Sequence, residues 1–186
     1  MFQKGVEVGP FKIVRLNSID AAKSFDCGDK DLNDFLLNRA ADFQNYRLAV
    51  NYACVDVDDA SKVYAYCSLA CDKVAMADFK DKTEFNHFRR EQGFPNAKRL
   101  KSYPAVKLCR LGVDVSARKK QIGTTIIDYI KSMFSVDSKA GCRFLTVDAY
   151  LDAVPFYIKN KFRFMNSEDH DPHTRLMYYD LMNIAV

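Results

Sequence analysis

A basic run leads directly into a helical pattern in the stretch "SARKKQIGTTIIDYI", residues 116–130. Arg118, Lys119 and Lys120 supply positive charge, and Gly123 has no Cβ, so a ligand can approach the backbone there. A helix N-terminus adds unpaired N–H groups and a partial positive charge. These features predict an anion site that could hold a pyrophosphate, and a solvated basic turn is the alternative that the loop alone leaves open.

Other phosphate and metal motifs are absent from the sequence. Neither GxxxxGK[ST] nor GxGxxG occurs. The six cysteines contain no CxxC pair, and several lie in apolar runs where a free cysteine behaves as a small hydrophobe. The one close histidine pair, His170 and His173, lies in "SEDHDPHTR", where Asp-Pro and polar neighbours favour a turn. We therefore expect no metal site.

The elements on both sides of the basic loop must position it. A strand pattern, "AVKLCRLGVDV" at 105–115, precedes the loop, and an amphipathic helix at 121–134 follows it. The apolar stripe of this helix consists of Ile122, Ile126, Ile130 and Met133.

The rest of the chain mixes hairpins with strand–helix–strand crossovers, so the sequence predicts an α+β fold with a mixed sheet. Asp29 is the expected N-cap of a helix at 29–46. The other expected elements are strands at 11–17, 51–57 and 62–70, a helix at 82–94, a strand at 142–149, a helix at 152–161 capped by Asp152, and strands at 162–165 and 174–182.

Composition indicates one globular domain, because the chain has 186 residues, of which 48% are hydrophobic. No apolar run is long enough to span a bilayer and no signal segment is recognisable, so we expect a cytoplasmic protein without a membrane partner. The net charge is +4, but residues 80–120 hold 12 Lys/Arg against 4 Asp/Glu. This basic segment favours an anionic ligand or partner, with an ordinary basic surface as the alternative.

The segment from 105 to 162 resembles the GNAT superfamily of acyl-CoA-dependent N-acyltransferases. The resemblance rests on "CRLGVD", "RKKQIG", "FLTVDA" and "AVPFYIKNKF", which occur in the family's order. It implies a central, mostly antiparallel, twisted sheet of about six to seven strands flanked by helices, and it implies acetyl-CoA as co-substrate. Two family glycines are replaced here, by Gln121 in the loop and by Lys161 at a helix end.

The resemblance also implies the roles of individual residues. The backbone of Leu111, Gly112 and Val113 would pair with the pantetheine arm, and one of these N–H groups would stabilise the oxyanion. Tyr157 would protonate the leaving thiolate, since a tyrosine hydroxyl carries its proton at neutral pH. The pyrophosphate would lie on Arg118, Lys119, Lys120, Gln121, Ile122, Gly123 and Thr124. The general base is open, with Asp114, Asp148 and solvent water as candidates.

The N-terminal stretch "FDCGDKDLNDFLLNRA" resembles a narrower GNAT subgroup that includes toxin–antitoxin acetyltransferases, which acetylate aminoacyl-tRNA. This likeness implies charged tRNA as an acceptor, an antitoxin as a partner, and pairing of two copies as in many such domains. A small amine or a protein amino group is the alternative acceptor. A non-catalytic CoA-binding protein with a degenerate loop is the alternative function, and a nucleic-acid-binding module ranks last because no RNA-binding signature supports it.

Overall fold

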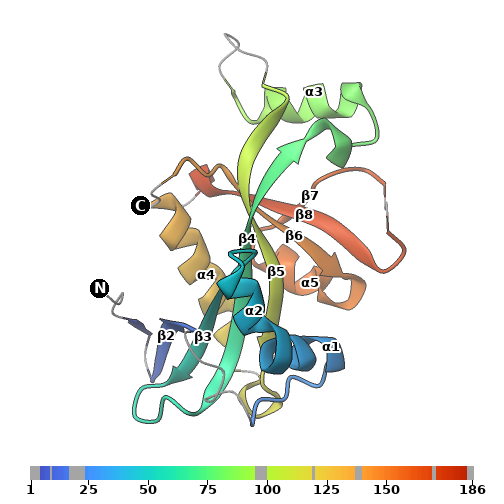
Figure 1. Cartoon of the computed structure of the whole chain (residues 1–186). Coiled ribbons are helices and arrows are strands. Elements are labelled where there is room, and N and C mark those ends of the chain that lie inside the picture. Colours follow the sequence, from blue (N-terminus) through green and yellow to red (C-terminus); the bar gives the residue numbers. More distant parts are fainter. Residues whose placement is uncertain are drawn as a thin grey trace. The chain divides into compact units, whose positions relative to one another are not determined.

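The computed structural model describes residues 5–8, 10–16, 24–94, 100–118, 120–136, 140–168 and 171–183. Figure 1 shows the elements in their chain order. The strands are β1 (Val6–Val8), β2 (Phe11–Arg15), β3 (Val50–Asp56), β4 (Val63–Ala75), β5 (Ser102–Val113), β6 (Phe144–Tyr150), β7 (Arg163–Phe164) and β8 (Thr174–Asp180). The helices are α1 (Lys30–Asp34), α2 (Ala40–Asn45), α3 (Lys82–Glu91), α4 (Ile122–Ser135) and α5 (Val154–Lys159), and a π-helical turn (Phe35–Arg39) joins α1 to α2.

The strands form a sheet in the order β1-β2-β3-β4-β5-β6-β8-β7. The β1–β2, β2–β3, β3–β4, β6–β8 and β7–β8 pairs are antiparallel, whereas β5 and β6 are parallel. The predicted α+β fold with a mixed, mostly antiparallel sheet is confirmed. The described residues form eight strands, so the expected six to seven was too few, because the short strand β1 was not recognised before β2.

Contacts divide the chain into two compact units. The first, here called the loop unit, contains Met1–Ala70 and Leu108–Ile130, and the second, the tyrosine unit, contains Cys71–Lys107 and Lys131–Val186. Strands β4 and β5 and helix α4 each have one part in each unit. Among the described residues, no helix has the length and apolarity that crossing a membrane requires.

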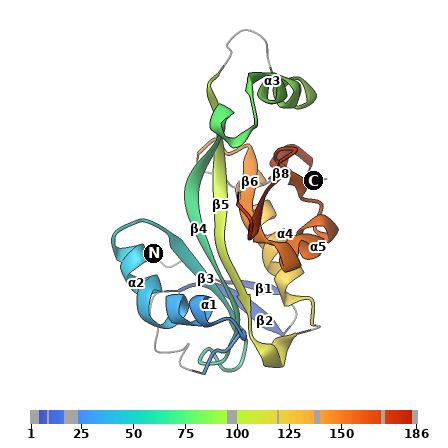
Figure 2. The same ribbon diagram turned by 90° about the vertical axis from the view of Figure 1, so that its right-hand side faces the viewer.

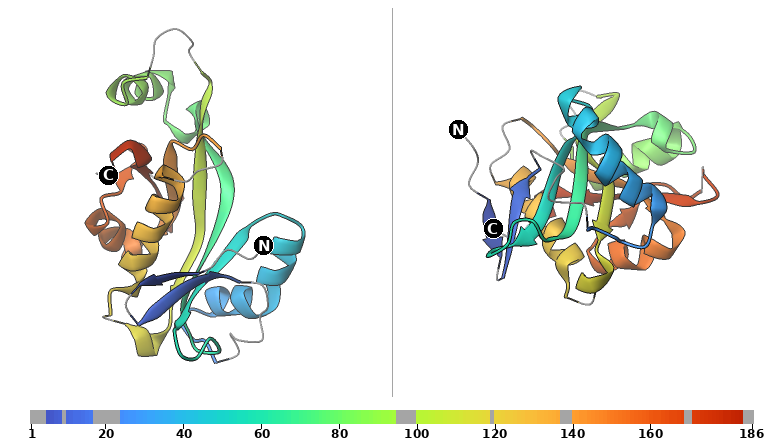
Figure 3. Two further views of the ribbon diagram at one scale, coloured as in Figure 1. Left: turned by 90° about the vertical axis from the view of Figure 1, so that its left-hand side faces the viewer. Right: turned by 60° about the horizontal axis from the view of Figure 1, so that its bottom comes forward.

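The loop unit packs helices on both faces of its strands. Helices α1 and α2 cover one face of β3–β5, and α4 lies on the other (Figures 1 and 2). On the α1 side Tyr66 is fully buried, its hydroxyl donates to the Leu32 carbonyl at 2.7 Å, and its ring stacks on Phe35. On the α4 side Tyr129 meets Tyr52 of β3, with ring centroids 5.9 Å apart. Figure 3 shows β1 and β2 continuing this part of the sheet beyond β3.

The tyrosine unit has an aromatic core. Phe85 and Phe88 of α3 pack against Tyr103 of β5, Phe144 of β6 and Tyr178 of β8. Asp81 caps α3 by accepting hydrogen bonds from two amides of its first turn, and Gly93 closes the helix at φ +63°. The helix predicted at 82–94 is therefore confirmed, with its last turn at residue 91.

Most predicted elements lie within two or three residues of their expected positions, and β4 is longer than predicted. Asp29 is the N-cap of α1, as expected, and accepts hydrogen bonds from the amides of Asp31 and Leu32. The cap assigned to Asp152 was wrong. A 3₁₀ turn at Leu151–Ala153 intervenes between β6 and α5, so Asp152 lies inside that turn and Ala153 occupies the N-cap.

Candidate functional site

The end of β5 lies beyond the segment that pairs with β6. The parallel register joins Ala105–Lys107 to Phe144–Thr146, all within the tyrosine unit. Leu111, Gly112 and Val113 follow the last paired residue and belong to the loop unit. On the side of β6, the backbone groups of a strand segment beyond the paired residues can bind an extended ligand, as the resemblance to the acyltransferases implies.

Gly112 is a packing glycine. It is not among the described glycines with positive φ, which are Gly28 and Gly93. A Cβ at Gly112 would lie 2.8 Å from Cε1 of Tyr66 and 3.3 Å from Cζ of Phe25. The Tyr66 ring therefore approaches the β5 backbone closely, and only glycine leaves room for it.

Asp114 closes the end of β5 and begins a 3₁₀ turn, Val115–Ala117. Its carboxylate accepts hydrogen bonds from the amides of Asp26 and Ser116, each at 2.9 Å, and from the Ser116 hydroxyl at 2.6 Å. Burial acts to raise the pKa of Asp114, but these hydrogen bonds outweigh it and hold the pKa below its usual value. A carboxylate that is stabilised in this way is a weak base, so Asp114 is best assigned as a turn residue.

The described residues of the basic run are exposed, yet they contact other residues of the loop unit. Arg118 is exposed, yet its Nη2 donates to the Cys27 carbonyl at 2.8 Å. Lys120 is exposed, with its Nζ 5.5 Å from the centre of the Tyr64 ring. Lys119, also predicted to bind the coenzyme, lies outside the described residues. Arg118 is thus held by a specific partner, which a solvated surface turn would not require.

Gln121 has φ +57°, the left-handed conformation that favours glycine. It stands where the acyltransferase motif that this loop resembles has its first glycine, so here a residue with a Cβ holds a backbone conformation that favours glycine. The amide of Thr125 donates to the Gln121 carbonyl at 3.0 Å, which starts the 14-residue helix α4. The amides of Ile122, Gly123 and Thr124 precede this bond and are those that a helix leaves without intrahelical partners.

Replacing Gln121 by glycine should stabilise the protein by about 0.5–1 kcal/mol. The left-handed conformation costs a residue with a Cβ about 1–2 kcal/mol, and the greater freedom of glycine in the unfolded chain offsets part of the gain. Thermal unfolding of Gln121→Gly is the measurement. Arg47→Gly is the matched control, since Arg47 has the same φ of +57° just after α2 and should gain similarly. A loss of stability in Gln121→Gly alone would show that its side chain is needed.

Tyr157 is on α5 in the tyrosine unit and is 6% exposed. Pro155 lies in the first turn of this helix, as predicted. The Tyr157 ring meets Phe156 and Phe162 edge to face, with centroids 5.1 and 5.3 Å apart. The side chain is therefore held in a fixed orientation by aromatic packing, which suits a positioned acid.

The end of α5, like the loop before α4, has a left-handed residue at a family glycine position. Lys161, at the second family glycine position, has φ +67°. Just before it, the Asn160 carbonyl accepts a hydrogen bond from the buried Lys131 Nζ at 2.8 Å, and Lys131 also lies 4.1 Å from the centre of the Tyr179 ring. Both replaced glycines thus keep a glycine-like backbone.

The remaining base candidate, Asp148, is on β6 and forms an ion pair with Lys107. It lines a cavity of about 250 Å³ in the tyrosine unit together with Ala77, Asp78, Asn166, Glu168, Asp171, Thr174 and Leu176. The carboxylates of this cavity already have partners. Asp78 accepts from the Ala75 amide, Asp171 accepts from the His173 amide, and Glu168 pairs with Lys80. The cavity therefore does not identify a base.

The basic segment 80–120 does not form a single surface on one unit. Residues 80–107 belong to the tyrosine unit and residues 108–120 to the loop unit. Lys98, Arg99 and Lys119 lie outside the described residues.

In the described part of the chain, no group of three His, Cys, Asp or Glu side chains is arranged to hold a metal. His170 also lies outside it.

Comparisons with known proteins concern the whole chain. No family model and no curated protein matches it. AtaT complexed with acetyl-methionyl-tRNAfMet matches with a TM-score of 0.73 and 22% identity over 92% of this chain and 95% of that one. A tyrosine-to-phenylalanine variant of KacT matches with a TM-score of 0.72 and 22% identity over 93% and 96%. AtaTR bound with AcCoA matches with a TM-score of 0.71 and 21% identity over 94% and 96%.

The chain has the GNAT fold. At these identities the likeness concerns fold, and it agrees with the element order predicted for the acyltransferases. Nine of the ten predicted coenzyme residues are described, and all ten positions fall in the loop unit of this GNAT fold, whereas Tyr157 belongs to the tyrosine unit. The N-terminal turn that holds Arg118 was not predicted as part of the site. The only signal for it was the motif "FDCG" itself.

Proposed function

We propose that this protein is an acetyl-CoA-dependent N-acetyltransferase that transfers an acetyl group to a primary amine by direct attack within a ternary complex. The supporting observation is the left-handed Gln121 between the end of β5 and the N-terminus of α4. This residue directly precedes a 14-residue helix whose first amides can bind pyrophosphate oxygens. We also infer that the two units act as one acyltransferase domain, because β4, β5 and α4 run through both.

In the proposed reaction the acceptor amine attacks the thioester carbonyl, and a backbone N–H among Leu111, Gly112 and Val113 stabilises the oxyanion. The tetrahedral intermediate then collapses, the carbon–sulfur bond breaks, and Tyr157 donates its proton to the departing thiolate. Water is the proposed acceptor of the amine proton, since the carboxylates of Asp114 and Asp148 are held by internal partners. Alignment of amine and thioester then supplies much of the rate.

The acceptor that we propose first is the α-amino group of an aminoacyl-tRNA. Two observations support it. The N-terminal stretch resembles the toxin subgroup, and solved structures of the same fold include AtaT complexed with acetyl-methionyl-tRNAfMet. Structures of the same fold also include AtaT bound to the C-terminus of the antitoxin AtaR and a KacTA–DNA complex. We accordingly infer an antitoxin as the protein partner.

Mass spectrometry of the products tests this function. The full chain is incubated with acetyl-CoA and a mixed pool of charged tRNA, peptides and polyamines, and the expected product is acetyl-aminoacyl-tRNA. The tRNA KM should rise at least about tenfold between 50 and 200 mM salt, because phosphate contacts release counterions. Acetylated peptides or polyamines with salt-insensitive turnover would replace the tRNA acceptor by a small amine or protein amine. Binding of acetyl-CoA without any product would instead indicate a non-catalytic CoA-binding protein.

A further inference from the structure

The N-terminal motif takes no part in the reaction described above. Its residues contact the start of the segment 114–124, which includes the proposed phosphate-binding residues and is here called the coenzyme loop. The turn Phe25–Gly28 makes three hydrogen bonds to the segment after β5. The Asp26 amide donates to the Asp114 carboxylate at 2.9 Å, and the Val115 amide donates to the Asp26 carbonyl at 2.9 Å. The third is the bond from Arg118 Nη2 to the Cys27 carbonyl. The turn therefore holds both the backbone and a charged side chain of the loop.

Asn33 of α1 also bonds to this turn. Its Oδ1 accepts from the Cys27 amide at 3.0 Å and from Cys27 Sγ at 3.1 Å. Its Nδ2 donates to Asp26 Oδ1 at 2.7 Å, and the same oxygen accepts from the Gly28 amide at 2.8 Å. One amide side chain thus fixes the turn, since three hydrogen bonds join it to Asp26 and Cys27.

The backbone conformation of Gly28 and its distance from Arg118 explain why a glycine follows Cys27 in the motif. Its φ is +82°, and a Cβ there would lie 3.1 Å from Arg118 Nη2. The backbone therefore favours glycine, and a Cβ at this position would press on the guanidinium. Phe25 adds a packing contact, since its ring meets Tyr66 edge to face, with centroids 5.5 Å apart, beside Gly112.

We propose that the Phe25–Gly28 turn, shaped by Asn33, is a positioning device that holds residues 114–118 and so orders the start of the segment 118–124, which is proposed to bind the coenzyme phosphates. The inference rests on the proposed use of acetyl-CoA. A loop that is ordered before the ligand arrives loses less conformational entropy on binding, so preordering strengthens binding without entering the chemical step. Arg118 donates one N–H group to Cys27, and since its guanidinium makes no further hydrogen bond to a described residue, we assign its other donors to a phosphate.

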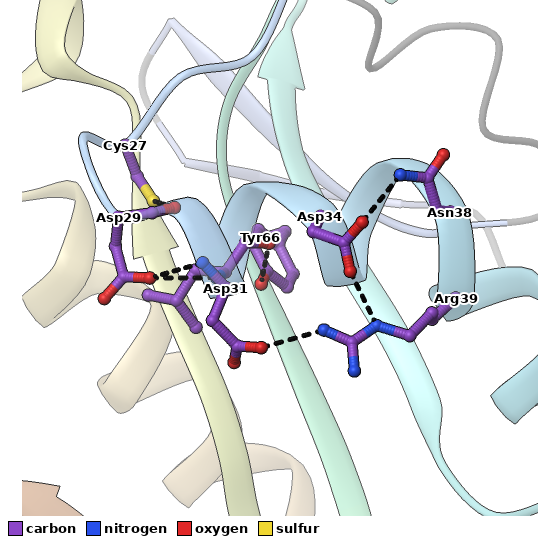
Figure 4. A network of polar contacts seen from close by, with 8 residues as sticks. Cys27, Asp29, Asp31, Asp34, Asn38, Arg39 and Tyr66 are labelled. Atoms are coloured by element: carbon purple, nitrogen blue, oxygen red, sulfur yellow. Dashed lines mark hydrogen bonds and ion pairs between the residues drawn. The ribbon is translucent and has the colours of Figure 1, made fainter.

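Asn33→Ala tests the proposal without changing any residue of the coenzyme loop. Acetyl-CoA Kd, measured by isothermal titration, and acetyl-CoA KM should both rise about tenfold, while kcat stays within about twofold. Asn38→Ala is the matched control. Asn38 lies five residues further along the sequence. Its amide donates to Asp34 at 2.8 Å and not to the turn, and Figure 4 marks this bond. Its acetyl-CoA Kd and KM should equal those of the wild type.

The outcomes separate this proposal from the proposed function. If the wild type fails to bind acetyl-CoA, the function is wrong and the positioning role falls with it. If the wild type binds and Asn33→Ala binds equally well, the positioning role alone is overturned. A merely structural role would reduce the folded fraction and so lower kcat with KM unchanged. Should Asn33→Ala not fold, Cys27→Ser and Cys27→Ala replace it. Serine keeps a donor for Asn33 and should retain affinity, whereas alanine should lose affinity.

Discussion

Tyr157→Phe should lower kcat by about 10²- to 10³-fold and leave the acetyl-CoA KM within about threefold. The substitution removes only the hydroxyl, so the edge-to-face contacts of the ring with Phe156 and Phe162 remain. The CoA thiolate must then leave without a positioned proton donor. The loss therefore falls on the step in which the carbon–sulfur bond breaks, and binding is preserved.

Steady-state kinetics with a fixed acceptor, together with titration of acetyl-CoA, measure this effect. Tyr178→Phe is the control, because Tyr178 is also a buried tyrosine of the tyrosine unit, and its hydroxyl accepts a hydrogen bond from Gln92 at 3.3 Å. It should lose a little stability and no kcat. Equal kcat values for Tyr157→Phe and the wild type would remove Tyr157 from the reaction, and solvent would become the proton donor.

Gly112→Ala should destabilise the protein by about 2 kcal/mol, which lowers Tm by roughly 4–8 °C for a chain of this size. The added Cβ would lie 2.8 Å from Cε1 of Tyr66. That ring cannot move aside easily, because it is fully buried, contacts Phe25 and Phe35, and its hydroxyl is bonded to the Leu32 carbonyl. Overpacking at this point also displaces the strand segment proposed to pair with pantetheine, so acetyl-CoA affinity should fall.

Thermal and denaturant unfolding measure the change. Gly141→Ala provides the comparison, since a Cβ at Gly141 would meet no atom within 4 Å, and it should alter the free energy of unfolding by less than about 0.5 kcal/mol. If Gly112→Ala proves as stable as Gly141→Ala, the Tyr66 ring can shift away from the added Cβ. The assignment of Gly112 as a required packing glycine would then be wrong.

Sequence pattern predicted the elements around the coenzyme loop because their burial follows a regular period. Ile122, Ile126 and Ile130 are all buried along α4, as their spacing indicates. Asp29 was equally predictable, since a cap bonds to amides two and three residues away. Both inferences need only neighbours within a few positions along the chain.

Features that depend on distant or irregular partners could not be predicted. The bonds of Asp26 to Asp114 and of Cys27 to Arg118 span 88 and 91 residues, and no local pattern carries such a pairing. The π-helical turn Phe35–Arg39 inserts into an otherwise regular helical pattern. The helix cap was wrongly assigned to Asp152, because Asp152 lies within a 3₁₀ turn that precedes α5. The division of the predicted site residues between two units likewise follows from tertiary contacts.

The left-handed backbone at Gln121 and Lys161 bears on how sequences of this fold diverge. At these two positions the backbone torsion angle φ is positive although the residue is not glycine. The backbone conformation therefore identifies the positions better than the residue type does. Exchange between glycine and a longer residue there costs a net free energy of only about 0.5–1 kcal/mol, so drift can erase the glycines while the loop keeps its shape. A search for distant homologues by backbone conformation should therefore succeed where a glycine pattern fails.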